Sequence, residues 1–227
     1  MMNRDSNAYT FGFAAAMVVV VASVLAFTAS SLKDLQQENV RKEKMQNILA
    51  TIGIETDRDG AEVLFNDHIV SQLALRNDGS VDEDVDPFSG IKLALELKKD
   101  PSEQRFPLYL ANVKEASYYI IPLRGSGLWD AIWGYIALES DRNTIKGAVF
   151  DHKAETAGLG AEITQQWFMN RFVGEKVFDN DGKLVGISVS KTNNDPKDLD
   201  KDDHEVDAIS GATITGDGVS DMIMERL

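Results

Sequence analysis

The residues whose types could do chemistry gather near the carboxyl end, in the segment DAISGATIT at residues 207–215. Hydroxyl groups stand there beside glycine and alanine, which let a bulky group approach the backbone closely. The segment predicts a tight turn that leads into a terminal helix over residues 218–227, with Ser210 or Thr215 as its cap. A helix start attracts phosphate, so the turn could hold a phosphorylated ligand. An ordinary helix cap explains the same residues.

Two upstream segments offer related chemistry. Residues 125–129 read GSGLW, and residues 155–160 read ETAGLG. Their glycines permit a close approach to the backbone, and the indole of Trp129 can stack on a planar ring. The alternative for the first segment is a turn between strands with a tryptophan in the core. The alternative for the second is a simple glycine loop.

The three segments together resemble the FMN-binding domains that a periplasmic flavin transferase modifies. The resemblance implies that residues 207–213 are the acceptor motif and that FMN is moved from FAD onto the hydroxyl of Thr213 as a phosphoester. It implies that Asp207 is needed for recognition or activation during transfer. It also implies that small residues shape the turn, namely Ser210, Gly211 and Ala212.

The same resemblance assigns the upstream segments to the flavin site. From the GLW segment it implies roles for Ser126, Gly127, Leu128 and Trp129. From the second segment it implies roles for Glu155, Thr156, Gly158, Leu159 and Gly160. Ala157 departs from the proline that the family usually has there, which loosens the turn but removes no functional group.

The order of anchor, helix, GLW segment, ETxGLG segment and acceptor motif resembles the C subunit of the sodium-translocating NADH:quinone oxidoreductase along nearly the whole chain. Residues 46–49 and 134–138 also look like this family. The resemblance implies an electron carrier of the bacterial inner membrane with its domain on the periplasmic face. The implied partners are the B-, D-, E- and F-type subunits, the lipid bilayer and the flavin transferase. Electrons would pass from an iron–sulfur centre to this FMN, then to an FMN of the B-type subunit, on their way to ubiquinone.

Other interpretations stay open from the sequence. The G subunit of an Rnf-type ferredoxin:NAD oxidoreductase shares the anchor, the fold and the flavinylation motif. A membrane-tethered module could instead bind a phosphorylated ligand without a covalent bond. A purely structural assembly protein would need only the anchor and the acidic surface.

Several classes of function are excluded by residues that the sequence lacks. The chain has no cysteine, which excludes thiolate-ligated clusters, cysteine nucleophiles and disulfides. The three histidines are far apart, so no metal site is predicted. No G-x-G-x-x-G follows a strand, and no nucleophile–histidine–acid spacing is present, so no catalytic residue is expected in this chain. The net charge of -14 disfavours nucleic acid as a partner.

The amino-terminal region predicts one transmembrane helix, with residues 1–32 as the anchor. Residues 6–32 carry no charged side chain, and roughly 20 apolar residues suffice to cross a hydrocarbon core. A cleaved signal peptide is the alternative, but its apolar stretch is usually about 7–15 residues. Basic residues flank the segment on both sides, so the positive-inside rule leaves the orientation open.

The rest of the chain predicts a connecting helix at residues 33–53 that Gly53 stops, followed by an FMN-binding domain at residues 54–227. The fold class expected for this domain is α+β, with a mostly antiparallel sheet and flanking helices. The expected elements are loops around a short helix at 57–90, strands at 118–121, 134–138 and 144–150, a helix at 163–173, and a hairpin of 177–178 with 183–190 around Asn180–Gly182.

The segment at residues 194–207 is strongly acidic. Clustered carboxylates could bind calcium, but the spacing lacks the loop glycine and the terminal glutamate of an EF-hand. The sequence therefore predicts a solvated, flexible connector in front of the acceptor motif.

Overall fold

The computed structural model describes residues 6–195 and 199–227. The chain divides into two compact units, Met1–Glu43 and Lys44–Leu227. Part of the acidic connector expected at residues 194–207, namely residues 196–198, lies outside the described residues.

Helix α1 runs over Asn7–Thr51 as one uninterrupted helix. The predicted anchor and the predicted connecting helix are thus continuous, because no glycine or proline stands between residues 13 and 52 to break the backbone hydrogen bonds. Gly53 follows with φ 79°, and Ile54 N donates to Leu49 O. This is the left-handed helix stop that the sequence predicts at Gly53.

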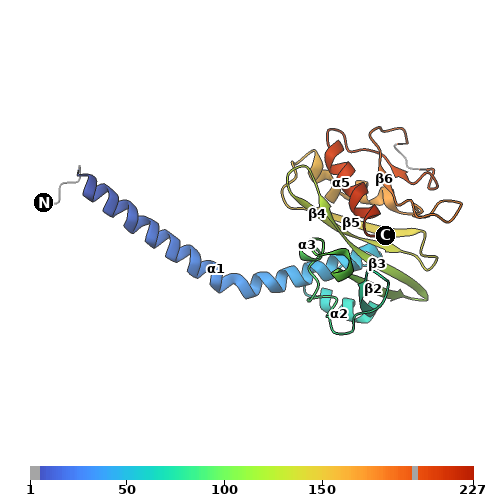
Figure 1. Cartoon of the computed structure of the whole chain (residues 1–227), viewed down its shortest axis with the longest axis horizontal. Helices are drawn as coiled ribbons and strands as arrows, with labels where there is room; N and C mark the ends of the chain where they lie inside the picture. The colour runs from blue at the N-terminus through green and yellow to red at the C-terminus, as the bar shows by residue number, and fades with distance from the viewer. Residues whose placement is uncertain (1–5, 196–198) are drawn as a thin grey trace. The chain divides into compact units, whose positions relative to one another are not determined.

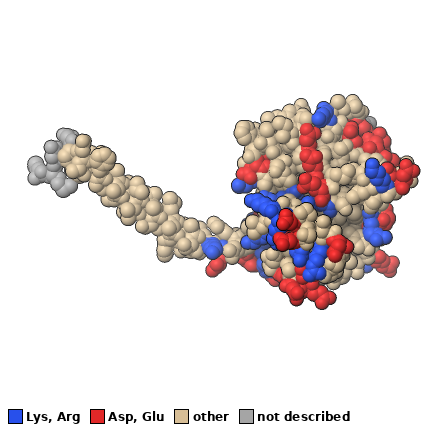
Figure 2. Space-filling model, in the orientation of Figure 1, with Lys and Arg blue, Asp and Glu red and all other residues tan. Residues whose placement is uncertain are grey.

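The first unit exposes large apolar side chains, among them Phe11, Val18 and Leu25. Its helix is long and apolar enough to cross a membrane, and none of its most apolar window is buried. Figure 2 shows this segment almost entirely in the colour of uncharged residues. The prediction of an N-terminal apolar helix is confirmed, and the helix is compatible with a single-pass membrane anchor.

The second unit is built on a five-stranded antiparallel meander (Figure 1). Consecutive strands are neighbours, and short turns join all of them except β1 and β2, between which residues 77–104 are inserted. The strands are β1 (Ile69–Arg76), β2 (Arg105–Val113), β3 (Ala116–Ser126), β4 (Ala131–Leu138) and β5 (Ile145–His152). The α+β class and the three strands expected at 118–121, 134–138 and 144–150 are confirmed.

The strands β1 and β2 were not expected from the sequence. The expectation of loops around one short helix at residues 57–90 was wrong for β1, although α2 (Ala61–His68) is that short helix. The run IVSQLALR of β1 suits a helix as well as a strand. In β2, Pro107 has no backbone N–H to donate to a neighbouring strand. Because proline is uncommon inside strands, its presence argued against a strand here.

Both faces of the sheet are covered. The alternation along β4 places Ile132 and Ile136 in one core and Ala137 in the other. The second core holds the end of α1 and α2, through Met45, Ile48, Leu49 and Phe65. The first core holds the remaining helices and loops, through Phe168, Phe172, Val189, Val219 and Met222.

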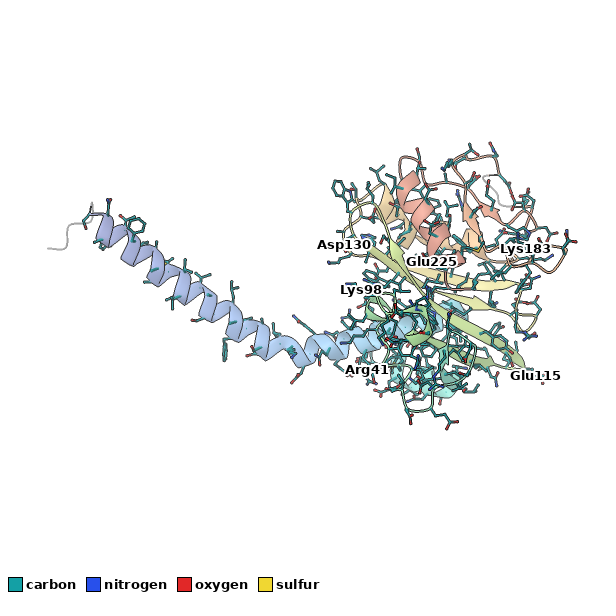
Figure 3. The ribbon with its side chains drawn as sticks, viewed as in Figure 1. Arg41, Lys98, Glu115, Asp130, Lys183 and Glu225 are labelled. Atoms are coloured by element: carbon teal, nitrogen blue, oxygen red, sulfur yellow. The ribbon has the colours of Figure 1, made fainter. Side chains whose placement is uncertain are left out.

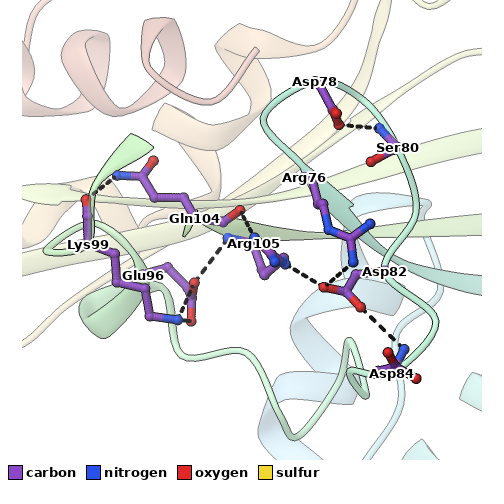
Figure 4. Close-up of polar contacts among 9 residues, drawn as sticks. All are labelled: Arg76, Asp78, Ser80, Asp82, Asp84, Glu96, Lys99, Gln104 and Arg105. Carbon is purple, nitrogen blue, oxygen red and sulfur yellow. Dashed lines mark hydrogen bonds and ion pairs between the residues drawn. The ribbon is translucent and has the colours of Figure 1, made fainter. Parts of the chain in front are cut away.

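The long insertion between β1 and β2 is held by buried carboxylates (Figure 4). Asp82 lies 2.9 Å from Arg76 and 2.6 Å from Arg105, and the hydrogen bond from Arg105 holds the pKa of Asp82 below its ordinary value. Glu96, in α3 (Leu93–Glu96), accepts from Lys99 at 2.7 Å and from the backbone of Arg105 at 3.0 Å. These contacts fix α3 and the 3-10 turn η1 (Pro101–Glu103) beside the sheet.

The region after β5 is more irregular than predicted. The helix expected at residues 163–173 is broken into η2 (Gly160–Thr164), α4 (Gln166–Met169) and η3 (Asn170–Phe172), because Gln165 is extended. The turn at Asn180–Gly182 forms, and the hairpin arms are joined by the Phe178–Leu184 bridge and by hydrogen bonds from Val185 N and Gly186 N to Val177 O, without forming regular strands. Beyond it, β6 (Ser188–Val189) pairs in parallel with β7 (Glu205–Val206).

The expected solvent exposure of the connector before the acceptor motif is found over most of residues 199–205, whereas residues 206–207 are buried. Besides forming β7, this part packs along the irregular region: Lys176 lies 2.5 Å from Asp202, and His204 Nδ1 lies 2.6 Å from Lys176 O. Local sequence patterns do not predict such contacts, because the two partners lie far apart in the sequence.

The terminal helix α5 covers Thr213–Met224, so its expected start at residue 218 was wrong. It packs on the end of β3 at very short range. A Cβ added to Gly218 would lie 2.2 Å from Ser126 O, and one added to Gly125 would lie 2.8 Å from Met222 Cβ. Glycine at both positions is what lets the helix approach the strand.

Gly218→Ala should therefore destabilise the domain by about 1–3 kcal/mol, since the methyl group meets rigid backbone. Helix propensity alone predicts the opposite effect, an increase of about 1 kcal/mol in the free energy of unfolding. Asp217→Ala, at the half-exposed neighbouring position, should change stability by less than about 0.5 kcal/mol. Thermal unfolding of the detergent-solubilised chain, followed by circular dichroism, measures both; a more stable Gly218→Ala variant would contradict this packing.

Candidate functional site

The structure brings the three predicted segments together. They line one small cavity of about 230 Å³ at the start of α5. Its walls are Leu128 from the GLW segment, Glu155, Thr156, Leu159 and Gly160 from the second segment, and Gly211, Ala212, Thr213, Ile214 and Thr215 from the carboxyl end.

Thr213 is the first residue of α5, and its side chain is exposed. The first backbone hydrogen bond of the helix runs from Gly216 N to Ala212 O. The N–H groups of residues 213–215 therefore lie at the helix start, where they have no partner within the helix. Such a terminus favours a negatively charged group beside the Thr213 hydroxyl.

No side chain caps α5. The expectation that Ser210 or Thr215 would cap it was wrong: Ser210 is exposed in the turn, and Thr215 points inward at 2% exposure. Gly211 has φ 74°, which glycine adopts without strain, and an added Cβ would lie 2.8 Å from Leu159 Cδ2. The turn is thus shaped by Gly211 and by Leu159 against it.

The carboxylate of Glu155 joins the three segments. One oxygen accepts from Trp129 N at 2.9 Å, and the other accepts from Thr215 Oγ1 at 2.7 Å. The Glu155 backbone donates to His152 Nδ1 at 3.1 Å. Glu155 is 8% exposed, so these hydrogen bonds form largely away from water, where losing one is costly.

Two of the motif glycines make room for this carboxylate. A Cβ at Gly127 would lie 2.5 Å from Glu155 Oε1, and a Cβ at Gly160 would lie 2.3 Å from Glu155 Oε2. From the sequence, these glycines were expected to admit a ligand. In the folded chain, the group that approaches them is the Glu155 side chain.

Trp129 is 67% exposed, which excludes the alternative of a core tryptophan. Its indole Nε1 donates to Thr156 Oγ1 at 3.1 Å, so the ring is joined to a residue of the cavity wall. Exposed apolar side chains line the cavity together with Thr213, namely Leu128, Leu159 and Ile214. An apolar rim around a helix start suits a planar ligand that carries a phosphate.

Asp207 is buried at the start of the acceptor motif. Its Oδ1 accepts from Asn194 N at 3.0 Å and from Asp195 N at 3.3 Å. Its backbone carbonyl accepts from Arg171 Nη1 at 2.6 Å. One carboxylate oxygen is therefore bound to the backbone of residues 194–195, while Oδ2 is buried without a hydrogen-bond partner among the described residues.

A larger groove of about 660 Å³ lies on the other side of Leu128, between α3, the end of β3 and α5. Lys98, Asp130 and Glu225 mark its charged rim (Figure 3). The hydrogen bond from Lys153, followed by one from the backbone of Ala131, lowers the pKa of Asp130 from its ordinary value. Side chains of both signs thus border the groove.

This fold and this site define a protein with an FMN-binding domain, and the family of that description matches residues 127–227. The C subunit of the Na(+)-translocating NADH-quinone reductase of Pseudomonas aeruginosa is 31% identical over 98% of this chain and 92% of its own length. That of Vibrio anguillarum is 32% identical over 96% of this chain and 89% of its own length. The chain belongs to the family of these C subunits.

Solved structures agree with the sequence relatives. The C subunit of the same reductase from Parabacteroides distasonis superposes with a TM-score of 0.75 at 36% identity, over 86% of this chain and 92% of that chain. Shewanella oneidensis NqrC gives a TM-score of 0.65 at 27% identity, over 82% and 90%. The family resemblance read from the motifs is confirmed.

Sequence reasoning missed the residues that support the site. Thr215 was considered only as a cap, and neither His152 nor Arg171 was connected with the motifs. The threonine two positions after the acceptor was a usable signal, because residues two apart on a helix face different sides. The other two become neighbours only through the tertiary fold.

Two threonines of α5 provide a matched test of the site. Thr215→Val removes the donor to Glu155 Oε2 inside the protein, so it should destabilise the unmodified chain by about 1–3 kcal/mol. Thr213→Val makes the same chemical change at an exposed position and should cost less than about 0.5 kcal/mol. Denaturant unfolding of both variants, produced without flavin transferase, measures the difference; equal stabilities would refute the role of Glu155 as the joining group.

Proposed function

We propose that this chain is the electron-carrying C subunit of a sodium-translocating NADH-quinone reductase, with FMN as its cofactor. Membership of the C subunit family and the FMN-binding domain at residues 127–227 support the proposal. The observation that carries it is the meeting of three segments at one exposed hydroxyl, that of Thr213, at the start of α5. Bound FMN supplies the redox chemistry, and the chain supplies position and electrostatics.

We further propose that Thr213 holds FMN as a phosphoester. In the transfer from FAD, the Thr213 oxygen bonds to the flavin-side phosphorus, the bond from that phosphorus to the bridging oxygen breaks, and AMP leaves. The hydroxyl proton passes to a base of the transferase, and nothing is oxidised or reduced. The resulting phosphodiester carries a negative charge beside the N–H groups of residues 213–215, where the helix terminus stabilises it.

The exposed apolar rim gives the flavin ring a place to lie. Ile214, exposed to 57%, lines the cavity with Leu128 and Leu159, and Trp129, exposed to 67%, is bonded to the cavity wall through Thr156. A contiguous apolar surface of this kind on a soluble domain marks a binding site. The hydrogen bond from Trp129 to Thr156 holds the indole ready for stacking and reduces the ordering cost of ligand binding.

The place of the protein in the cell follows from its helix and its cofactor. We propose that α1 anchors the chain in the bacterial inner membrane and that the FMN domain faces the periplasm, where the attaching flavin transferase acts. The partners are then the B-, D-, E- and F-type subunits of the complex. The absence of Asp, Glu, Lys, Arg and His from residues 6–32 supports the anchor, because a charged side chain in the hydrocarbon core is costly.

Thr213→Ala should abolish the bound flavin, and Thr213→Ser should retain it, because only the serine variant keeps the acceptor oxygen. Intact mass after co-expression with a flavin transferase is the measurement: the flavinylated chain is heavier by FMN minus one water. A Thr213→Ala chain that still carries the added mass would contradict the acceptor assignment. Flavin that leaves the wild-type chain on denaturation would instead favour the non-covalent phospholigand module.

Trp129→Phe should raise the emission yield of the attached flavin, because an indole close to the ring quenches its fluorescence. Trp167→Phe is the matched control: Trp167 is also exposed, at 45%, but its ring lies against Phe168 and Arg171, whereas Trp129 is bonded to Thr156 of the cavity wall. The measurement is steady-state emission per mole of flavin. Equal yields in the two variants would exclude the contact between Trp129 and the ring.

A further inference from the structure

Arg171 reaches from η3 to the first residues of the acceptor motif. Its Nη1 donates to Asp207 O at 2.6 Å and lies 3.5 Å from Ala208 O. The guanidinium carbon lies 5.0 Å from the ring centroid of Trp167. An aromatic face and a carbonyl acceptor together fix the direction of a guanidinium. Arg171 is thus a rigid link between the irregular region and the acceptor motif.

The backbone of Arg171 is itself fixed from the interior. Lys201 Nζ donates to Arg171 O at 2.8 Å and lies 3.3 Å from Glu175 Oε1. Glu175 is fully buried, and a buried carboxylate strongly favours keeping its cation in place. The link that Arg171 makes is therefore anchored in the core and does not depend on a mobile surface side chain.

Both the backbone carbonyl and the carboxylate of Asp207 accept hydrogen bonds. Arg171 holds its carbonyl, while its carboxylate accepts from the backbone of Asn194 and Asp195. With Asp207 at 6% exposure, little of this residue is accessible to an enzyme that meets the folded chain. We expect the family role implied for Asp207 to be exerted through the shape of the turn that follows it.

We infer that Arg171 is a positioning residue for flavin attachment: it holds the carbonyls of residues 207–208 so that the turn presents the Thr213 oxygen in one direction. The inference rests on the proposed phosphoester at Thr213 and adds the residue that prepares it. Transfer requires that oxygen to lie in line with the phosphorus–oxygen bond that breaks in FAD. If the turn is already ordered before the reaction, no further conformational entropy is lost in ordering it during the transfer.

The test uses the full-length chain in detergent, produced without flavin transferase, with purified transferase and FAD added. The rate of AMP release and the intact mass give kcat/KM for the chain as substrate. Arg171→Met should lower this value about tenfold or more, and Arg171→Lys, which keeps a charged donor, should restore part of it. Amide hydrogen exchange at residues 208–213 should become faster in Arg171→Met, while exchange in β3 and β4 stays unchanged.

Arg226→Met is the matched control, because Arg226 also stacks on an aromatic ring, at 4.6 Å from Phe106, away from the acceptor motif. Its thermal stability should fall about as much as that of Arg171→Met, with transfer unchanged. Should Arg171→Met fail to fold, Arg171→Gln replaces it with the same expected loss.

A wild-type rate in any folded variant without the cation at residue 171 overturns the inference, as does an equal loss of transfer in Arg226→Met. Thr213→Ala separates the two proposals. If that variant still accepts flavin, the covalent attachment to Thr213 is wrong. If it does not, and Arg171→Met reacts normally, only the role of Arg171 is wrong.

Discussion

The carboxylate of Glu155 is the group on which the arrangement of the site depends. It is buried, and a buried carboxylate is stable only with donors in place. Its two oxygens take those donors from the GLW segment and from α5, through Trp129 N and Thr215 Oγ1. The glycines at 127 and 160 leave the space that the carboxylate occupies. One side chain thereby sets the distance between the apolar rim and the acceptor hydroxyl.

The sheet gives that carboxylate fixed neighbours. Glu155 follows β5, the GLW segment joins β3 to β4, and α5 packs directly on the end of β3 through Gly218 and Gly125. A meander of short turns keeps β3, β4 and β5 adjacent, so loops at one end of these strands are close without long connections. The candidate site is thus built on adjacent strands of one sheet, while Thr213 lies exposed at the first position of α5.

Segments with little regular secondary structure are held in place by ion pairs between side chains instead of by the backbone hydrogen bonds of a sheet. Asp82 with two arginines fixes the insertion between β1 and β2, and Glu175 with Lys201 fixes the acidic segment before the acceptor motif. Both carboxylates are buried, so each specifies where its partner must lie. Such contacts explain how a chain with a net charge of -14 can order an acidic stretch that leads into the candidate site.

The sequence by itself determined the family and the residues of the proposed chemistry. Thr213, the two glycine segments, the apolar run at residues 6–32 and the strongest strands all belong to local patterns, which can be read without the fold. Tertiary structure alone decided what each pattern touches. The sequence of β1 is compatible with a helix as well as a strand, and its pairing with β2 makes it a strand. Likewise β6 pairs in parallel with β7, which lies later in the sequence. Thr215 is turned inward, and α5 begins at Thr213, because Glu155 and the end of β3 receive them there. The free energy of these long-range contacts depends on residues that are distant in the sequence. The strand pairings, the orientation of Thr215 and the start of α5 therefore could not be predicted from local sequence patterns.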